Sequence, residues 1–246
     1  MVVDSGIGGI STLVEIRRRF EHADILYFAD DVFMPYGSKS KIELIDHLAD
    51  VLERFENDIC GVVFACNTAT GVAAELLRKV FCFDIVGTEP AVVPACVDKE
   101  RTLVLVTPLE SRQIKFERLI VGKNVLVSPR PNLAAKIEKC LGKYGSVLAL
   151  EKSKGVLSEV EEIKNILAEN NIKKIVLGCT HYVFLKYTKL LNDFALFDGN
   201  VGVAAQARRV FADVGGGETE FVFASGNKKK SQLALRLFEE LSNFGL

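Results

Sequence analysis

The sequence lacks an excess of charge of either sign. Its 246 residues include 31 lysines and arginines and 32 aspartates and glutamates, which gives a net charge of −1. A chain without an excess of basic residues lacks the net positive charge that attracts a phosphate backbone or an anionic membrane. We therefore expect no nucleic-acid partner, and the isolated basic run at 228–230 does not change this expectation.

Long apolar runs are also missing. None approaches the roughly 20 residues that a helix needs to span a bilayer. The first residues carry neither the charged start nor the apolar stretch of a secretion signal. We therefore expect no membrane partner and a cytoplasmic location.

Closely spaced cysteine pairs are absent as well. The chain has six cysteines but no C-x-x-C pair of the kind that binds zinc: Cys60, Cys66, Cys82, Cys96, Cys140 and Cys179. In a reducing compartment most of them are expected to be buried as small apolar side chains. A zinc site built from Cys66, Cys179 and His181 is an unfavoured alternative, and we expect neither a metal nor a cofactor.

Short apolar runs rich in β-branched residues alternate with amphipathic stretches along the chain. The apolar runs lie at 24–30, 61–66, 83–88, 102–107, 124–129, 173–179, 195–199 and 221–225. Nearly continuous apolar strands separated by helices are typical of a parallel sheet covered on both faces. The predicted fold class is α/β, and the absence of a Gly/Ser linker places any domain boundary in a short loop.

Two of these runs end in the same way. VVFACNTATG at 62–71 and IVLGCTHYVF at 175–184 each read as a buried strand that delivers a cysteine, then polar residues and an amphipathic helix. The repetition fits two similar α/β halves, each contributing one thiol, Cys66 or Cys179, to a cleft between them. A lone cysteine at a strand end is usually buried and inert. Here polar residues follow both cysteines, which a purely apolar slot would disfavour.

Two facing thiols suit proton transfer at a carbon acid. A thiolate can remove a proton from one face of the carbon while a thiol returns one to the other face, which inverts a stereocentre without a cofactor. A nucleophilic hydrolase built on Cys179 and His181 is an alternative, but it leaves Cys66 without a role. His22 and His47 read as helix-surface or loop residues.

Other polar residues also follow predicted strands. Asp4 opens a glycine-rich turn whose backbone N–H groups could seat a carboxylate or phosphate at a helix start. Asp30 precedes the loop at 35–37, after which Ser38 or Ser40 should cap a helix. Thr107 closes a further strand.

These motifs resemble one family. DSGIGG at 4–9, PYG at 35–37, ACNTAT at 65–70 and GCTHY at 178–182, in this order, resemble the glutamate racemases of bacterial peptidoglycan synthesis, within the aspartate/glutamate racemase superfamily. The resemblance implies that Cys66 and Cys179 are the acid/base thiols, with Asp4 and His181 assisting proton transfer. It also implies that the amino acid is bound by Ser5, Pro35, Tyr36, Gly37, Asn67, Thr68, Thr107 and Thr180.

The resemblance further implies the architecture and the role. The fold would be two similar parallel-sheet α/β domains with the active site in the cleft between them, residues 1–95 plus 200–246 and residues 96–199. The chain would interconvert L- and D-glutamate without a cofactor, as a homodimer, and supply D-glutamate for peptidoglycan and hence for cell-wall biogenesis and cell shape.

The chain departs from the family pattern at several positions. Glu110 stands where the family tends to have the second threonine of T-x-x-T. Ser128, followed by Pro129, stands where the family has the cysteine of a Cys-Pro element. Arg130 is an added charge, and Glu138 matches the family's assisting acid only if two extra residues are allowed, so no role is assigned to it. The changes at Glu110 and Ser128 keep open a racemase acting on aspartate or another amino acid. An isomerase or decarboxylase of the same fold is a second alternative, but such decarboxylases need one cysteine, and the presence of both argues against it. The unassigned assisting acid keeps open a non-catalytic amino-acid-binding relative.

Overall fold

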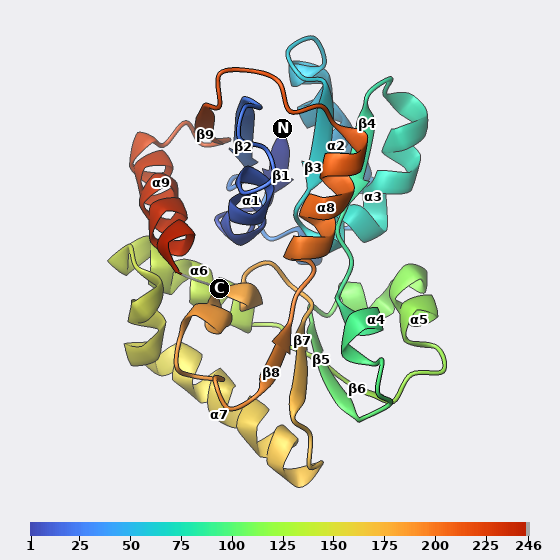
Figure 1. Ribbon diagram of the computed structural model, residues 1–246, viewed down its shortest axis with the longest axis vertical. Coiled ribbons are helices and arrows are strands. Elements are labelled where there is room, and N and C mark those ends of the chain that lie inside the picture. Colours follow the sequence, from blue (N-terminus) through green and yellow to red (C-terminus); the bar gives the residue numbers. More distant parts are fainter. Residues whose placement is uncertain (245–246) are drawn as a thin grey trace.

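The computed structural model describes residues 1–244 and contains two parallel β-sheets, the first in the upper half of Figure 1 and the second in the lower half. All strand pairs in both sheets are parallel. In spatial order, the first sheet consists of β4 (Asp84–Gly87), β3 (Gly61–Phe64), β1 (Val2–Asp4), β2 (Ile25–Ala29) and β9 (Thr219–Phe223). The second consists of β6 (Val125–Pro129), β5 (Thr102–Val106), β7 (Lys174–Leu177) and β8 (Ala195–Phe197).

The central strands of each sheet are buried on both faces, which explains their apolar runs. Successive side chains of a strand point to opposite faces, and Val2 and Val3 of β1 accordingly belong to two different apolar clusters. In β5, Leu103 and Val104 likewise belong to two different apolar clusters, one on each face of the second sheet. The predicted fold class, two parallel-sheet α/β domains, is therefore confirmed.

Helices cover the four sheet faces. The first sheet packs on one face against α1 (Ile10–Arg17), α8 (Asn200–Val210) and α9 (Lys228–Asn243), and on the other against α2 (Lys41–Phe55) and α3 (Asn67–Val80). The second sheet packs against α6 (Leu133–Tyr144) and α7 (Lys154–Glu169) on one face and against α4 (Val92–Ala95) and α5 (Ile114–Ile120) on the other. Four 3₁₀ helices complete the described part: η1 (Tyr36–Ser38), η2 (Glu110–Arg112), η3 (Val147–Lys152) and η4 (Tyr182–Tyr187).

The helix α2 shows how the sequence sets a boundary. Ser40 accepts a hydrogen bond from the backbone N–H of Glu43, and the Glu43 carboxylate accepts one from the backbone N–H of Ser40. This capping box satisfies two N–H groups that have no partner within the helix. Of the two serines predicted as caps, Ser40 is therefore the one that caps α2.

The prediction of an amphipathic helix after Cys179 is wrong. Residues 182–187 form the short 3₁₀ helix η4, and five of its six side chains are buried: Tyr182, Val183, Phe184, Leu185 and Tyr187. Because the segment is apolar on nearly all sides, it lies within the protein and has no solvent face that would suit a surface helix.

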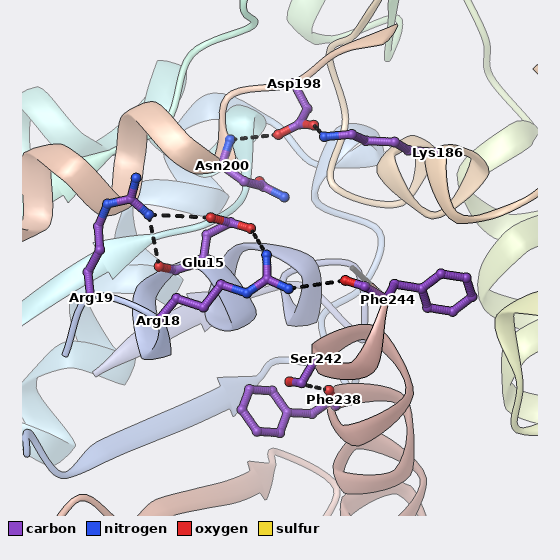
Figure 2. Close-up of polar contacts among 9 residues, drawn as sticks. All are labelled: Glu15, Arg18, Arg19, Lys186, Asp198, Asn200, Phe238, Ser242 and Phe244. Atoms are coloured by element: carbon purple, nitrogen blue, oxygen red, sulfur yellow. Dashed lines mark hydrogen bonds and ion pairs between the residues drawn. The ribbon is translucent and has the colours of Figure 1, made fainter. Parts of the chain in front are cut away.

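Polar contacts tie the two sheets together near the segment that joins β8 to α8 (Figure 2). Lys186 of η4 bonds to Asp198 at 3.0 Å, and the other oxygen of Asp198 accepts a hydrogen bond from the backbone N–H of Asn200 at 2.9 Å. Beyond α9, the carbonyl of Phe244 accepts a hydrogen bond from Arg18 of α1 at 3.3 Å, and the ring of Phe244 packs edge-on against Tyr187 of η4, with ring centroids 5.5 Å apart. These contacts fix η4, and with it the residues just before it, relative to the first sheet.

The chain passes from the first sheet to the second and then returns. Strands up to residue 87 and β9 build the first sheet, and strands between 102 and 197 build the second. The predicted first domain runs to residue 246, and its residues 245 and 246 lie outside the described part of the chain. Within residues 1–244, no helix combines the length and apolar character needed to cross a membrane.

Candidate active site

Both cysteines lie where the strand order of a sheet reverses. In the first sheet the chain runs from β1 to β2 on one side and from β3 to β4 on the other, so the reversal falls between β1, which ends at Asp4, and β3, which leads to Cys66. In the second sheet it falls between β5, which leads to Thr107, and β7, which leads to Cys179. Ligands of open parallel sheets bind at such points, beyond the carboxyl ends of the strands.

Cys66 is a buried thiol at the start of a helix. It is the N-cap residue of α3 and is 8% exposed. Burial and the charge of Asp4 raise the pKa of the Cys66 thiol well above its ordinary value, and Cys179 nearby acts in the same direction. The backbone N–H groups of Thr68 and Ala69 oppose this shift without cancelling it. Without a ligand, Cys66 is therefore a thiol at neutral pH.

Asp4 is fully buried and only partly satisfied. Its Oδ1 accepts a hydrogen bond from the backbone N–H of Gly6 at 3.1 Å, whereas its Oδ2 has no hydrogen-bond partner within residues 1–244. Burial raises the pKa of Asp4 to about 6, although His181 pulls it in the opposite direction. The carboxylate is thus mostly ionised at pH 7 and lies close enough to Cys66 to influence its titration.

Cys179 has a different partner. It is 9% exposed and precedes His181, whose Nε2 lies 2.6 Å from Oε2 of Glu138 in α6. Burial disfavours the charged imidazole, but Cys179 and Glu138 beside the ring outweigh it and raise the pKa of His181 well above its ordinary value. The second thiol therefore has an imidazolium next to it at neutral pH.

Glu138 is a site residue that the sequence did not assign. The same Oε2 that bonds to His181 also accepts a hydrogen bond from the backbone N–H of Ile7 at 3.3 Å. Glu138 thus connects the glycine-rich turn of the first domain with the histidine of the second. The available signal was the resemblance, in which Glu138 matches the family's assisting acid if two extra residues are allowed.

The two domains meet at Gly8. A Cβ atom at this position would lie 2.4 Å from Oγ1 of Thr180 and 2.6 Å from Nδ1 of His181, far inside van der Waals contact. Only glycine permits this approach. The turn after Asp4 consequently packs directly against the segment after Cys179, and the two reversal points face each other.

The other predicted binding residues lie at the reversal points, in the loop at 35–37 and, for Thr107, directly after β5. Four are buried at the reversal points: Ser5, Asn67, Thr68 and Thr180. Oδ1 of Asn67 has no hydrogen-bond partner among the described residues. In the loop at 35–37, Tyr36 is buried and donates its hydroxyl to Asp30, whereas Pro35 and Gly37 are exposed. The hydroxyl of Thr107 accepts a hydrogen bond from the backbone N–H of Glu110 at 3.2 Å.

A cavity of about 630 Å³ lies apart from the cysteines. Residues of both domains line it, among them Gly87 and Leu196, and it includes neither thiol. We place the candidate active site at the cysteines because buried ionisable side chains converge there. Within residues 1–244, no three or more His, Cys, Asp or Glu side chains are arranged to hold a metal ion.

Comparison with known proteins decides the family. No family model matches the chain. A glutamate racemase of Leptospira borgpetersenii serovar Hardjo-bovis (strain JB197) is 36% identical over 212 residues, which cover 82% of this chain and 77% of that protein. Glutamate racemase 2 of Bacillus subtilis (strain 168) is 36% identical over 97% of this chain and 94% of its own length. The chain belongs to the glutamate racemase family. It is therefore an isomerase, as the resemblance implied.

Solved structures of glutamate racemases share the fold. The Escherichia coli enzyme, in complex with L-glutamate and the activator UDP-MurNAc-Ala, has a TM-score of 0.77 over 98% of this chain and 94% of its own, at 23% identity. The Thermus thermophilus enzyme, in complex with β-chloro-D-alanine, has a TM-score of 0.76 over 97% of this chain and 92% of its own, at 25% identity. The arrangement of two parallel-sheet domains is thus that of the glutamate racemase family.

Proposed function

We propose that the chain is a cofactor-independent racemase that interconverts L- and D-glutamate: one thiolate removes the α-proton, and the other thiol donates its own proton to the opposite face. The observation that carries the proposal is the placement of Cys66 and Cys179 at facing reversal points of two sheets, in a site closed around Gly8. Each thiol has its own ionisable partner, Asp4 or His181. The curated relatives at 36% identity support glutamate as the substrate.

The reaction requires one proton to leave and one to arrive. Starting from D-glutamate, Cys66 as thiolate removes the α-proton, and Cys179 as thiol donates its proton to the opposite face of the carbon. The product is L-glutamate, with Cys66 now protonated and Cys179 a thiolate. Starting from L-glutamate, the same steps run in reverse.

Substrate binding supplies the positive charge that the Cys66 side lacks. Oδ2 of Asp4 and Oδ1 of Asn67 are buried acceptors without partners in residues 1–244, and an ammonium group has the donors to satisfy them. A cation near Cys66 favours its thiolate form. The amino group of the substrate therefore lowers the pKa that burial had raised, and it does so only when a carbon acid is in place.

His181 and Glu138 support the second thiol. The Glu138 carboxylate holds His181 at 2.6 Å and favours its charged form. An imidazolium beside Cys179 stabilises the thiolate that must form when this residue acts as base.

The product fits a role in supplying D-glutamate for peptidoglycan and so for cell-wall biogenesis and cell shape. The cytoplasmic location and the homodimer expected from the sequence stay predictions.

Deuterium incorporation tests the mechanism. The protein is incubated in D2O with L- or D-glutamate, and the α-proton is followed by NMR together with the sign of optical rotation. We expect deuterium to enter from both enantiomers with inversion. Cys66→Ser and Cys179→Ser should each slow racemisation at least 100-fold, within the range attributed to a general acid or base. Cys140→Ser, which removes a buried thiol outside the site, is the control and should not slow racemisation.

Other outcomes would redirect the proposal. Exchange with aspartate but not glutamate would replace the substrate. Exchange with neither, together with a higher melting temperature in glutamate, would indicate a non-catalytic binding protein. Full racemase activity in both Cys66→Ser and Cys179→Ser would refute the two-thiol mechanism.

A further inference from the structure

The carboxylate of Asp30 joins a helix to the loop at 31–39. Asp30 follows β2, is 1% exposed, and accepts a hydrogen bond from the hydroxyl of Tyr36 at 2.8 Å. The same oxygen, Oδ2, lies 2.6 Å from Nε2 of His47 in α2. The backbone N–H of Asp30 donates to the carbonyl of Asp4 at 2.9 Å, which ties the carboxylate to the end of β1. The buried carboxylate of Asp30 therefore has two hydrogen-bond partners, Tyr36 in the loop and His47 in the helix.

His47 also touches the loop directly. Its ring stacks on Phe33, with ring centroids 3.8 Å apart and an angle of 11° between the planes. Phe33 in turn meets the ring of Tyr36 edge-on at 6.4 Å, and the ammonium of Lys39 lies 4.3 Å from the Phe33 ring centre. The sequence suggested a helix-surface or loop position for His47, but three-quarters of its side chain is covered.

We propose that His47 is a positioning residue, which holds the loop at 31–39 in place by donating to Asp30 and so fixing Tyr36. The loop adjoins the site, because a Cβ atom at Gly6 would lie 3.1 Å from Sδ of Met34. The inference rests on the proposed racemase function, in which Tyr36 and its neighbours bind the amino acid. His47 itself does not touch the thiols or the reacting carbon. Its Nε2–H donates to Asp30 in the charged ring, and also in the neutral ring when the proton is on that nitrogen.

The effect should appear in substrate binding. Without the His47 donor, Oδ2 of Asp30 keeps only the Tyr36 hydroxyl, and an underpaired buried carboxylate favours conformations in which water reaches it. If only a tenth of the molecules then hold the loop in place, the apparent affinity falls about tenfold, because it scales with the competent fraction. Once substrate has bound, the loop is in place, so kcat should change less than twofold.

Three substitutions separate the hydrogen bond from the stacking. His47→Gln can still donate to Asp30 but loses the aromatic stack, His47→Phe keeps the stack but has no donor, and His47→Ala loses both. We expect KM for both enantiomers to rise about tenfold in His47→Phe and His47→Ala, and to stay within about threefold of wild type in His47→Gln. His22→Gln, at an exposed loop position, is the matched control and should leave both constants unchanged.

A measurement without substrate keeps this inference separate from the proposed function. Hydrogen exchange of residues 31–39 in the ligand-free protein should be several-fold faster in His47→Phe and His47→Ala than in wild type or His47→Gln. Failure of wild type to racemise glutamate would overturn the proposed function, while the exchange data would still decide the role of His47 in the loop. Unchanged KM and unchanged exchange in His47→Ala would overturn the inference, as would a His47→Gln variant no better than His47→Ala.

Discussion

Replacing Glu110 by glutamine should stabilise the protein at alkaline pH. Glu110 lies in η2 and is 4% exposed, and its Oε2 has no hydrogen-bond partner within residues 1–244. Burial raises the pKa of Glu110 from 4.5 to about 8, with Glu89 adding to the effect and Lys115 opposing it. Glutamine has nearly the same shape and does not titrate.

The sign follows from the protons bound in each state. Because the pKa is higher in the folded protein, the folded state binds more protons than the unfolded state between about pH 4.5 and pH 8. The free energy of unfolding therefore falls as pH rises through this window, and the loss is complete above the folded pKa. At about 1.4 kcal/mol per pH unit, the full loss is roughly 5 kcal/mol, of which roughly 3 kcal/mol is already lost at pH 7.

Urea unfolding followed by circular dichroism at pH 5, 7 and 9, with a reductant present, measures this loss. Between pH 5 and pH 9, the stability of Glu110→Gln relative to wild type should increase by about 4 kcal/mol. Glu161→Gln, which removes an exposed carboxylate of α7, should follow the wild-type profile. Parallel pH profiles for wild type and Glu110→Gln would refute the argument that a buried, ionisable Glu110 opposes folding.

Two further substitutions probe the meeting of the domains at the site. Gly8→Ala should lower kcat/KM at least 100-fold in a racemisation assay by circular dichroism, because the added methyl group displaces Thr180 and His181. Gly142→Ala, where an added Cβ meets nothing within 4 Å, should retain activity. Glu138→Gln should lower kcat/KM roughly tenfold or more and move the NMR titration of His181 to lower pH, since the carboxylate favours the charged ring. A His181 titration that does not move in Glu138→Gln would contradict this coupling.

Much of the architecture could be predicted from the sequence because it depends on local patterns. Apolar strands buried on both faces leave nearly continuous apolar runs, and the eight runs placed every strand of the two sheets except the short β1. Cys66 and Cys179 were also found locally, since each directly follows such a run at the edge where parallel sheets bind ligands. The fold class and the family were confirmed, whereas the roles of the individual site residues stay predictions.

Contacts between residues far apart in the sequence could not be predicted from local patterns. Glu138 meets His181 across 43 positions, and His47 meets Asp30 across 17. Both residues lie on amphipathic helices, whose periodicity shows which face is buried but not which polar group reaches a neighbouring element. The 3₁₀ helix after His181 was missed for another reason, because its apolar pattern does not distinguish a buried short helix from a longer one.

The two halves of the site reach a reactive thiol by different routes. On one side Asp4 and burial hold Cys66 in its protonated form, and no cation within residues 1–244 bonds to either group. On the other side a cation is built in, because Glu138 keeps His181 charged beside Cys179. In the proposed mechanism the substrate ammonium supplies the missing charge at Cys66, so this thiol is activated only by a bound amino acid. The Cys66 thiolate then serves as the base for one enantiomer, and inversion further requires that Cys179 carry the proton that it donates to the opposite face.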